Sequence, residues 1–562
     1  MFRNLWIASL WFGTAWFALS WTTSAARLPQ QSAPANTSDP ALLLADALNL
    51  YRKGSFDQAF AKYNEILKAD SHSGDAYAGM IRCYLKQDKV HEADDALQKG
   101  LQANPASTDL KVAEGELLFR QGEIPEAGRL FDDVIATPPD PVHPDTPPNA
   151  RAYLGAARVA EANAMYAREH ILLTRAHSLD ATDPDIRRLW IETLSTDDSI
   201  QSLEDYLAHP NNDDEATRHR LRARLDFLKA ARTEKADRCR PVSGITKTKT
   251  GMLSISLNNN TWQGSGLAVE INDKPSRLLL DTGASGVLVS SQLASLAGLK
   301  PVAAVPMGGI GDKPDTMAHI AYADSVKIGE MEFRNCALYI VDRLPTAVDG
   351  IIGTDVFAQF LIELDFPTST LQLSQLPPRP GEAPSKAALS SSGDAPAQPE
   401  MKSSEGAAQT RPGSQYQDRD IAPEMHSYVQ AFRIGHDLLI PTTIDGRAQK
   451  LFLLDTGSFD NTISTAAAQE VTKIHRAPRI DVKGINGSVK KVFVADSVTL
   501  DFGHLRQTVP NMVAIDLTGT SRATGTEVSG TLGMVMLRLL KVRLNYRDAL
   551  ADFQYVQKTP RR

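Results

Sequence analysis

The sequence contains little cysteine, shows no strong charge bias, and lacks the signatures of several common enzyme classes. Its three cysteines (Cys83, Cys239 and Cys336) are widely spaced and odd in number, which excludes a disulfide framework and any cysteine-rich zinc module. The net charge of −7 is spread along 562 residues, so there is no basic footprint for nucleic acid. The HExxH, GxSxG, phosphate-loop and strand-borne GxGxxG motifs are absent, and with them the usual signals of four enzyme classes.

Potential metal ligands are equally sparse. The twelve histidines are scattered without ligand spacing, so the sequence predicts no metal site and no cofactor. Cys336 lies in a strand-like run and is interpreted as a small buried apolar residue. The composition, with 42% hydrophobic and 23% charged residues, is typical of a globular protein, and the length predicts three or four domains.

Residues 1–26 have the pattern of an export signal. Arg3 gives a positive start, an uncharged apolar run follows from Leu5 to Trp21, and Ser24-Ala25-Ala26 offers small residues for cleavage before Arg27. The alternative is an uncleaved N-terminal anchor, because the apolar run is slightly long for a signal and just long enough to span a bilayer. Both interpretations predict an extracytoplasmic protein, periplasmic or secreted.

Residues 41–235 show a helical pattern with a 34-residue period. The period appears in several independent columns: Tyr51, Leu85 and Phe119; Gly54, Asp88 and Gly122; Ala59, Ala93 and Ala127; Tyr63, Leu97 and Phe131. A 34-residue unit with a small residue where two helices cross resembles the tetratricopeptide repeat, so an all-α solenoid is expected. Such an array either binds a partner protein or substrate on its concave face, or stabilises and spaces the rest of the chain.

After residue 250 the hydrophobic period changes from 3.6 to 2, and the same hairpin pattern occurs twice. In the first copy, Asn272-Asp273 separates two apolar runs, the second of which leads into Asp281-Thr282-Gly283. In the second copy, Asp445-Gly446 separates two apolar runs, the second of which leads into Asp455-Thr456-Gly457. Asp-Gly between apolar runs is a strong hairpin signal.

Later landmarks also recur in the same order. A glycine-rich segment follows each hairpin, Gly308–Gly311 in the first copy and Gly484–Gly487 in the second. An apolar run ending in glycine comes next, at Gly353 and at Gly533, and each copy ends in one more strand. The shared order indicates an internal duplication.

Both copies resemble the retropepsin-type aspartic protease lobe, over residues 251–376 and 425–556. The resemblance implies two all-β lobes after the solenoid, with Asp281 and Asp455 as the catalytic pair. It implies that Thr282 and Thr456 lock the two loops together by hydroxyl-to-backbone hydrogen bonds. The supporting positions it assigns are Thr282, Gly283, Ala284, Thr456, Gly457 and Ser458, and the flap positions are Gly309, Ile310, Gly311, Gly484, Ile485, Asn486 and Gly487.

Hydrolysis of a peptide bond without a covalent intermediate explains the need for two carboxyl groups. Two carboxylates about 3 Å apart cannot both ionise, so one acts as general base and the other as general acid. Ser458 stands where the pepsin-like pattern has a hydroxyl beside the carboxylate, whereas Ala284 follows the retroviral pattern. We therefore hypothesise that Ser458 bonds the ionised Asp455 and makes it the more easily deprotonated partner.

The chain departs from the retroviral pattern at an ion pair. Retroviral enzymes carry an acidic residue two positions after the signature glycine and an arginine after the later glycine. Here Ser285 and Phe459 replace the acid, and Thr354 and Met534 replace the arginine. Because both members are missing together, the change is interpreted as the loss of one coupled contact.

Residues 377–424 are rich in Pro, Ser, Ala, Gly and Gln, which predicts a disordered linker. A linker of this length lets the two lobes pair within one chain, and the unequal lobes favour that pairing over pairing between chains. The predicted function is an exported aspartic endopeptidase that acts on a peptide or protein, with the repeats recruiting substrate or partner. The alternative is a non-catalytic peptide-binding scaffold. No nucleic acid is expected, and no membrane contact beyond a possible N-terminal anchor.

Overall fold

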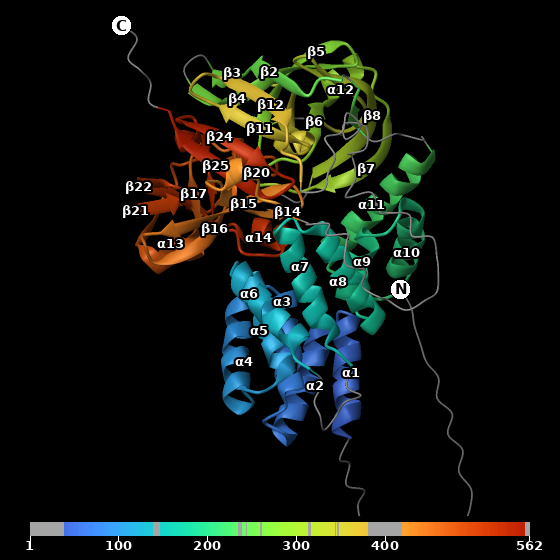
Figure 1. Ribbon diagram of the computed structural model, residues 1–562. Coiled ribbons are helices and arrows are strands. Elements are labelled where there is room, and N and C mark those ends of the chain that lie inside the picture. The colour runs from blue at the N-terminus through green and yellow to red at the C-terminus, as the bar shows by residue number, and fades with distance from the viewer. Residues whose placement is uncertain are drawn as a thin grey trace, which may run out of the picture.

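The computed structural model describes residues 39–138, 147–233, 239–242, 244–258, 261–312, 316–342, 344, 348–379 and 419–556. The predicted export segment, residues 1–26, lies outside these ranges, as do residues 380–418 of the predicted linker. Within them the chain forms a helical array followed by two β lobes (Figure 1). Among the described residues, no helix is long and apolar enough to cross a membrane.

The 34-residue period of the sequence corresponds to antiparallel helix pairs. Gly54, Asp88 and Gly122 all have positive φ, which places each at the turn between two helices of a pair. Ala59, Ala93 and Ala127 have no exposed surface, because the helices cross at these small residues. The helices of the array are α1 (Pro40–Arg52), α2 (Phe56–Ala69), α3 (Gly74–Lys86), α4 (Val90–Ala103), α5 (Thr108–Arg120), α6 (Ile124–Ala136), α7 (Ala150–Ala162), α8 (Tyr166–Leu179), α9 (Pro184–Glu192), α10 (Thr196–Ala208) and α11 (Glu215–Thr233).

The face formed by helices α1, α3, α5, α7 and α9, here called the odd-helix face, is filled by the chain itself. Arg151 on α7 pairs with Glu116 on α5 at 2.6 Å and with Asp185 on α9 at 3.3 Å. The loop between α10 and α11 adds Asn212, whose side chain donates to Asp185 and is 3% exposed. Buried charges require such partners, and here the partners come from the array and not from a ligand.

Lobe 1 is built on one sheet in the order β1-β9-β6-β10-β5-β4-β8-β7, with β3 paired to β4. Asn272 and Asp273 both have positive φ, as a two-residue hairpin turn requires. The elements are β1 (Arg240–Pro241), β2 (Lys247–Gly251), β3 (Leu253–Asn258), β4 (Thr261–Ile271), β5 (Lys274–Asp281), β6 (Val287–Ser290), α12 (Ser291–Leu296), β7 (Pro301–Met307), β8 (Thr316–Ile328), β9 (Met331–Val341), β10 (Gly350–Gly353), η1 (Thr354–Phe357), β11 (Phe360–Asp365) and β12 (Thr370–Gln375).

Lobe 2 repeats this plan in the order β14-β15-β16-β23-β17-β22-β21-β18, with a separate hairpin β19-β20. Asp445 and Gly446 form the matching turn, again at positive φ. The elements are η3 (Pro423–Met425), β13 (Val429–Gln430), β14 (Phe432–Ile434), β15 (Asp437–Ile444), β16 (Ala448–Leu454), β17 (Thr462–Ser464), α13 (Thr465–Val471), β18 (Ile474–Arg476), β19 (Lys483–Gly484), β20 (Gly487–Ser488), β21 (Phe493–Phe502), β22 (Leu505–Ile515), α14 (Thr518–Thr524), β23 (Gly530–Leu532), α15 (Met534–Leu537), β24 (Leu540–Asn545) and β25 (Leu550–Tyr555).

The two lobes of the chain pair with each other through a shared sheet, ordered β13-β25-β24-β11-β12-β2. At its centre β11 of lobe 1 runs antiparallel to β24 of lobe 2. Glu363 on β11 pairs with Arg543 on β24 at 2.8 Å and with Lys541 at 3.2 Å. One hydrophobic core continues through both lobes, so the pair is a single folded unit.

The array is docked onto lobe 2. Phe119 and Phe131 of the array share one buried cluster with Phe432, Leu451 and other residues of lobe 2. The Thr526 hydroxyl donates to the Phe119 carbonyl at 2.6 Å, and both partners are buried. The last helix, α11, packs along β7 of lobe 1, so the array contacts both lobes (Figure 1).

Lobe 1 begins earlier than residue 251, because β1 and β2 already belong to its sheets. Cys336 is buried in strand β9 as predicted, but it is not a free thiol, because it forms a disulfide with Cys239, from the segment between α11 and β1. Their separation of 97 residues hid the pairing, since only the folded sheet brings the two together. At the end of the predicted linker, Ala422 is buried against Met425 and Leu550, so lobe 2 begins before residue 425.

Candidate active site

Asp281 and Asp455 stand at the ends of two equivalent strands. β5 ends at Asp281, and β16 ends one residue before Asp455. In lobe 1, β10 runs parallel to β5 and brings Gly353 opposite Asp281. In lobe 2, β23 runs parallel to β16 in the same way. Each Asp-Thr-Gly loop therefore follows a strand that is paired in parallel with a strand from much later in the chain, β10 in lobe 1 and β23 in lobe 2.

The two loops are interlocked by four hydrogen bonds. The Thr282 hydroxyl donates to the Leu454 carbonyl at 2.6 Å and accepts from the Thr456 N–H at 2.9 Å. The Thr456 hydroxyl makes the reciprocal pair, with the Leu280 carbonyl at 2.9 Å and the Thr282 N–H at 3.0 Å. Thr282 is fully buried and Thr456 is 2% exposed. These are the hydroxyl-to-backbone bonds that the sequence predicts, and being buried they are costly to lose.

The interlocked loops bring the two carboxyl groups into contact, where they hydrogen-bond to each other. Gly283 N–H donates to Asp281 at 2.8 Å, and Ser458 N–H donates to Asp455 at 3.0 Å. A side chain at Gly457 would overlap the Asp281 carboxylate. The approach of the two aspartates therefore depends on glycine at that position.

Burial, followed by the charge of Asp281, raises the pKa of Asp455 to about 8. Burial also raises the pKa of Asp281, but the Gly283 and Gly457 N–H groups oppose that increase. The two carboxyl groups therefore titrate as one coupled pair, in which one is protonated while the other is ionised.

The hypothesis that Ser458 makes Asp455 the more easily deprotonated partner was wrong. The Ser458 hydroxyl donates to the Asp460 carbonyl at 3.0 Å, and only its backbone N–H reaches Asp455. The hydroxyl is therefore not available to stabilise the ionised carboxylate.

The predicted flap segments meet each other at the dyad. Asn486 N–H donates to the Ile310 carbonyl at 3.1 Å, and the Asn486 side chain donates to the Gly309 carbonyl at 3.3 Å. Ile485 packs in a lobe 1 cluster that includes Ala284, the residue after the first Asp-Thr-Gly. The structure thus brings together residues Asp281, Thr282, Gly283, Ala284, Gly309, Ile310, Gly311, Asp455, Thr456, Gly457, Ser458, Gly484, Ile485, Asn486 and Gly487 around one site.

Family models match the sequence of the two lobes and of the array. Residues 267–356 and 440–535 each match the aspartyl protease model, and residues 50–105 match a tetratricopeptide repeat model. The two β lobes are retropepsin-like, and the array is tetratricopeptide-like.

Solved structures with detectable similarity cover parts of the chain. A retropepsin-like aspartic protease from Rickettsia conorii is 20% identical with a TM-score of 0.17, over 23% of this chain and 95% of that one. A tetratricopeptide protein of Thermus thermophilus is 18% identical with a TM-score of 0.25, over 34% and 99%. PilF of Pseudomonas aeruginosa is 17% identical with a TM-score of 0.24, over 34% and 86%. No curated protein sequence matches the chain.

Each retropepsin-like lobe replaces the missing ion pair in its own way. In lobe 1 the Ser285 hydroxyl donates to Asp355 at 3.0 Å, and Gly286 N–H donates to the same carboxylate at 2.9 Å. In lobe 2 the Asn461 side chain accepts from Gly533 N–H at 2.8 Å. The contact between the first loop and the later glycine element is therefore retained with different residues, so the ion pair is lost but the contact that it made is not.

Sequence reasoning missed Asp437 and His436, at the start of β15. Burial raises the pKa of Asp437, and the charges of Asp281 and Asp355 raise it further, whereas His436 opposes them. His436 Nε2 lies 3.2 Å from the Asp437 carboxylate. The hairpin register could have indicated this position, since Leu439 pairs with Leu453 and the next residues on each strand lead to Asp437 and Asp455.

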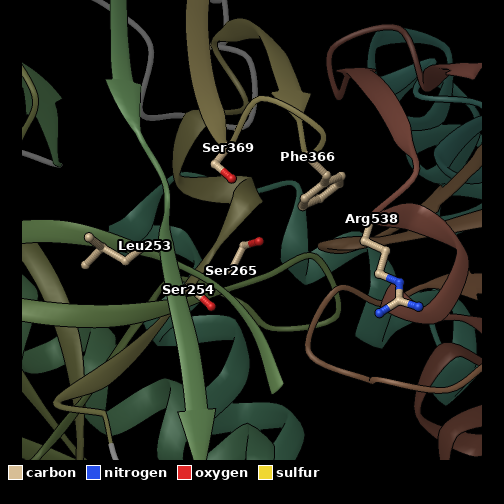
Figure 2. A pocket seen from close by; sticks show the side chains of 6 residues that line it. All are labelled: Leu253, Ser254, Ser265, Phe366, Ser369 and Arg538. Atoms are coloured by element: carbon tan, nitrogen blue, oxygen red, sulfur yellow. The ribbon is translucent and has the colours of Figure 1, made fainter. Parts of the chain in front are cut away.

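A separate cavity of about 210 Å³ lies at the junction of the lobes (Figure 2). Ser254 and Ser265, on the paired strands β3 and β4, form one side of it, and Phe366 and Arg538 form the other. None of these residues belongs to the dyad or the flaps. Among the described residues, no group of histidine, cysteine, aspartate or glutamate has the arrangement of a metal site.

Proposed function

We propose that the protein is an exported aspartic endopeptidase that cleaves peptide bonds with a water molecule held between Asp281 and Asp455. The supporting observation is the approach of two carboxyl groups, Asp455 buried and Asp281 partly buried, on interlocked loops. Two carboxyl groups with separated pKa values are the arrangement that general acid–base hydrolysis requires.

In this mechanism the ionised Asp281 takes a proton from water as the water oxygen bonds to the peptide carbonyl carbon. The protonated Asp455 gives its proton to the carbonyl oxygen, which produces a neutral tetrahedral diol. Collapse of the diol breaks the C–N bond while a proton moves to the leaving nitrogen, releasing a carboxylic acid and an amine. The flap segments around Ile310 and Ile485 supply backbone groups that hold an extended substrate over the dyad.

Export is supported by the N-terminal pattern of residues 1–26 together with the disulfide between Cys239 and Cys336. Disulfides persist in oxidising compartments and are rare where thiols are kept reduced. We therefore place the protein outside the cytoplasm, periplasmic or secreted, with the N-terminal segment either removed or retained as an anchor.

The repeats are proposed to act in protein–protein contact. Their odd-helix face is filled by residues of the chain, and their edge is buried against lobe 2. A substrate or partner protein recruited by the array therefore binds on its remaining outer surface.

The test is digestion of an unbiased peptide mixture by the mature protein between pH 3 and pH 7, alongside Asp281→Asn and Asp455→Asn. We expect each substitution to reduce cleavage by about 10³-fold or more, because each removes one member of the acid–base pair. Thr282→Ser, which keeps the interlocking hydroxyl, is the matched control and should retain activity. Peptide binding without cleavage at any pH would favour the non-catalytic scaffold instead.

A further inference from the structure

Helix α11 lies between the helical array and the flap hairpin β7-β8 of lobe 1. On one face, Leu221 and Leu225 pack with Ile191 and Tyr206 of helices α9 and α10. On the other side α11 runs along β7, and the Phe227 ring stacks on Tyr322 of β8 with 6.4 Å between ring centroids. Ala223 is 7% exposed, although helix α11 is the outermost element of the array. The helix is therefore buried on both sides.

β7 is the terminal strand of the lobe 1 sheet. Terminal strands present unpaired backbone groups, and proteins commonly cover them with a helix or loop. α11 lies along this edge strand in the structure (Figure 1). The first strand of the hairpin that carries the lobe 1 flap is thus in contact with the array.

A covalent link anchors this arrangement. Cys239 follows the end of α11 by six residues and is disulfide-bonded to Cys336 on β9. Cys336 pairs in register with Ala323 on β8, the strand that also carries Tyr322. Immediately after Cys239, β1 pairs with β9, and Val242 N–H donates to Glu332 at 2.9 Å. The C-terminal end of the helix is therefore tied to the flap-bearing sheet.

The flap tip itself is held by lobe 2. Met307 and Val305 of β7 pack in the same cluster as Ile485 from the opposite flap. Substrate entry requires the tips to separate, and such movements of flaps commonly limit turnover. Among the described residues, no array helix packs on the lobe 2 flap β19-β20 to an extent similar to that of α11 on β7.

We propose that α11, anchored by the Cys239–Cys336 disulfide, is a strap that holds the lobe 1 flap closed and so regulates access to the dyad. The inference rests on the proposed function for its consequence, because a closed flap matters to an enzyme that must admit a polypeptide. The two flaps then differ: both must break the contacts between their tips, but the lobe 1 flap must also separate from α11. Loosening the strap speeds entry of substrate without altering Asp281 or Asp455.

The test is hydrogen exchange of the intact, oxidised protein, which reports flap opening whether or not the protein cleaves peptides. Phe227→Ala removes the stacked ring, and we expect amides of residues 301–307 to exchange about three- to tenfold faster, the size expected for loss of one aromatic pair. The double variant Cys239→Ser with Cys336→Ser should act in the same direction. Arg222→Ala, at an exposed position on the same helix, is the matched control and should leave exchange unchanged.

Tyr322→Leu removes the same ring contact from the β8 side. This variant tests the strap if Phe227→Ala unfolds α11. Unchanged exchange of residues 301–307 in both variants, with α11 still protected, would overturn the strap. If the variants exchange faster but the wild-type protein cleaves no peptide, the strap stands and the proposed endopeptidase activity is refuted. If the wild-type protein cleaves peptides but exchange in the variants is unchanged, the endopeptidase stands and the strap is refuted. If both hold, the variants should also show a raised kcat/KM for a protein substrate.

Discussion

The two lobes carry the same catalytic hairpin, but the rest of the molecule contacts them differently. Lobe 2 shares a hydrophobic cluster with the array through Phe432 and Leu451, so it is fixed as part of one core. Among the described residues, lobe 1 meets the array mainly through helix α11, which lies along β7 and stacks Phe227 on Tyr322. Packed cores resist deformation, whereas a single helix on an edge strand can separate. The duplication has thus produced two lobes that share one core but differ in how firmly the array contacts them.

The dyad, by contrast, is nearly symmetric. Burial raises the pKa of both Asp281 and Asp455, to about 8 for Asp455, and backbone N–H groups oppose the increase at each of them. The charge of Asp281 also raises the pKa of Asp455, so the titration of the pair depends on both lobes.

The largest effect is expected from an alanine at the signature glycines. A Cβ at Gly457 would overlap the Asp281 carboxylate, whereas a Cβ at Gly283 would lie 3.3 Å from the Asp455 carboxyl group. We predict that Gly457→Ala reduces peptide cleavage by about 10²-fold, as expected when a catalytic group is displaced by about 1 Å. Gly283→Ala should cost clearly less. Initial rates at matched protein concentration measure both, and equal losses would show that the two loops are equivalent after all.

An intermediate effect is expected on stability as a function of pH. Folded Asp455 keeps its proton up to about pH 8, whereas an unfolded aspartate releases it near pH 4. Between these values the folded state binds more protons than the unfolded state, so the free energy of unfolding falls as the pH rises. Denaturant unfolding at pH 5 and at pH 8 should show this loss in the wild type and a smaller loss in Asp455→Asn. A loss of the same size in the variant would contradict the assignment of the proton to Asp455.

The smallest effect is expected from Ser458→Ala. Its hydroxyl bonds the Asp460 carbonyl, and the N–H that reaches Asp455 is kept by alanine. We predict a stability change within about 0.5 kcal/mol, as for most substitutions of partly exposed side chains, and a pH–rate profile that keeps its acid limb. A shifted acid limb would restore the role that the sequence suggested for this hydroxyl.

Much of the site could be predicted because its signals are local. Each of these signals depends on only a few neighbouring residues: the turns at Asn272 and Asp445, the apolar strands before each aspartate, and the small residues Ala59 and Ala93. Backbone preference and hydrophobic period are fixed at that range. The repeat, both hairpins and the placement of the aspartates at strand ends could therefore be predicted from the sequence alone.

Other features could not be predicted because they depend on atoms far apart in the chain. Cys239 and Cys336 are 97 residues apart, and the pairing of β1 with β9 brings them together. Asp437 became relevant through its approach to Asp281 and Asp355 in the other lobe.

The sequence by itself therefore determined the parts: a helical repeat, two duplicated hairpins and two aspartates in equivalent loops. Only the tertiary structure decided how the array contacts each lobe, that α11 lies along the strand before the lobe 1 flap, and how the two aspartates meet. The physical reason is that propensity and periodicity act along the chain, whereas burial, charge and edge-strand packing act through space. In a duplicated protein, propensity and periodicity make the two halves alike, whereas burial, charge and packing through space make them different.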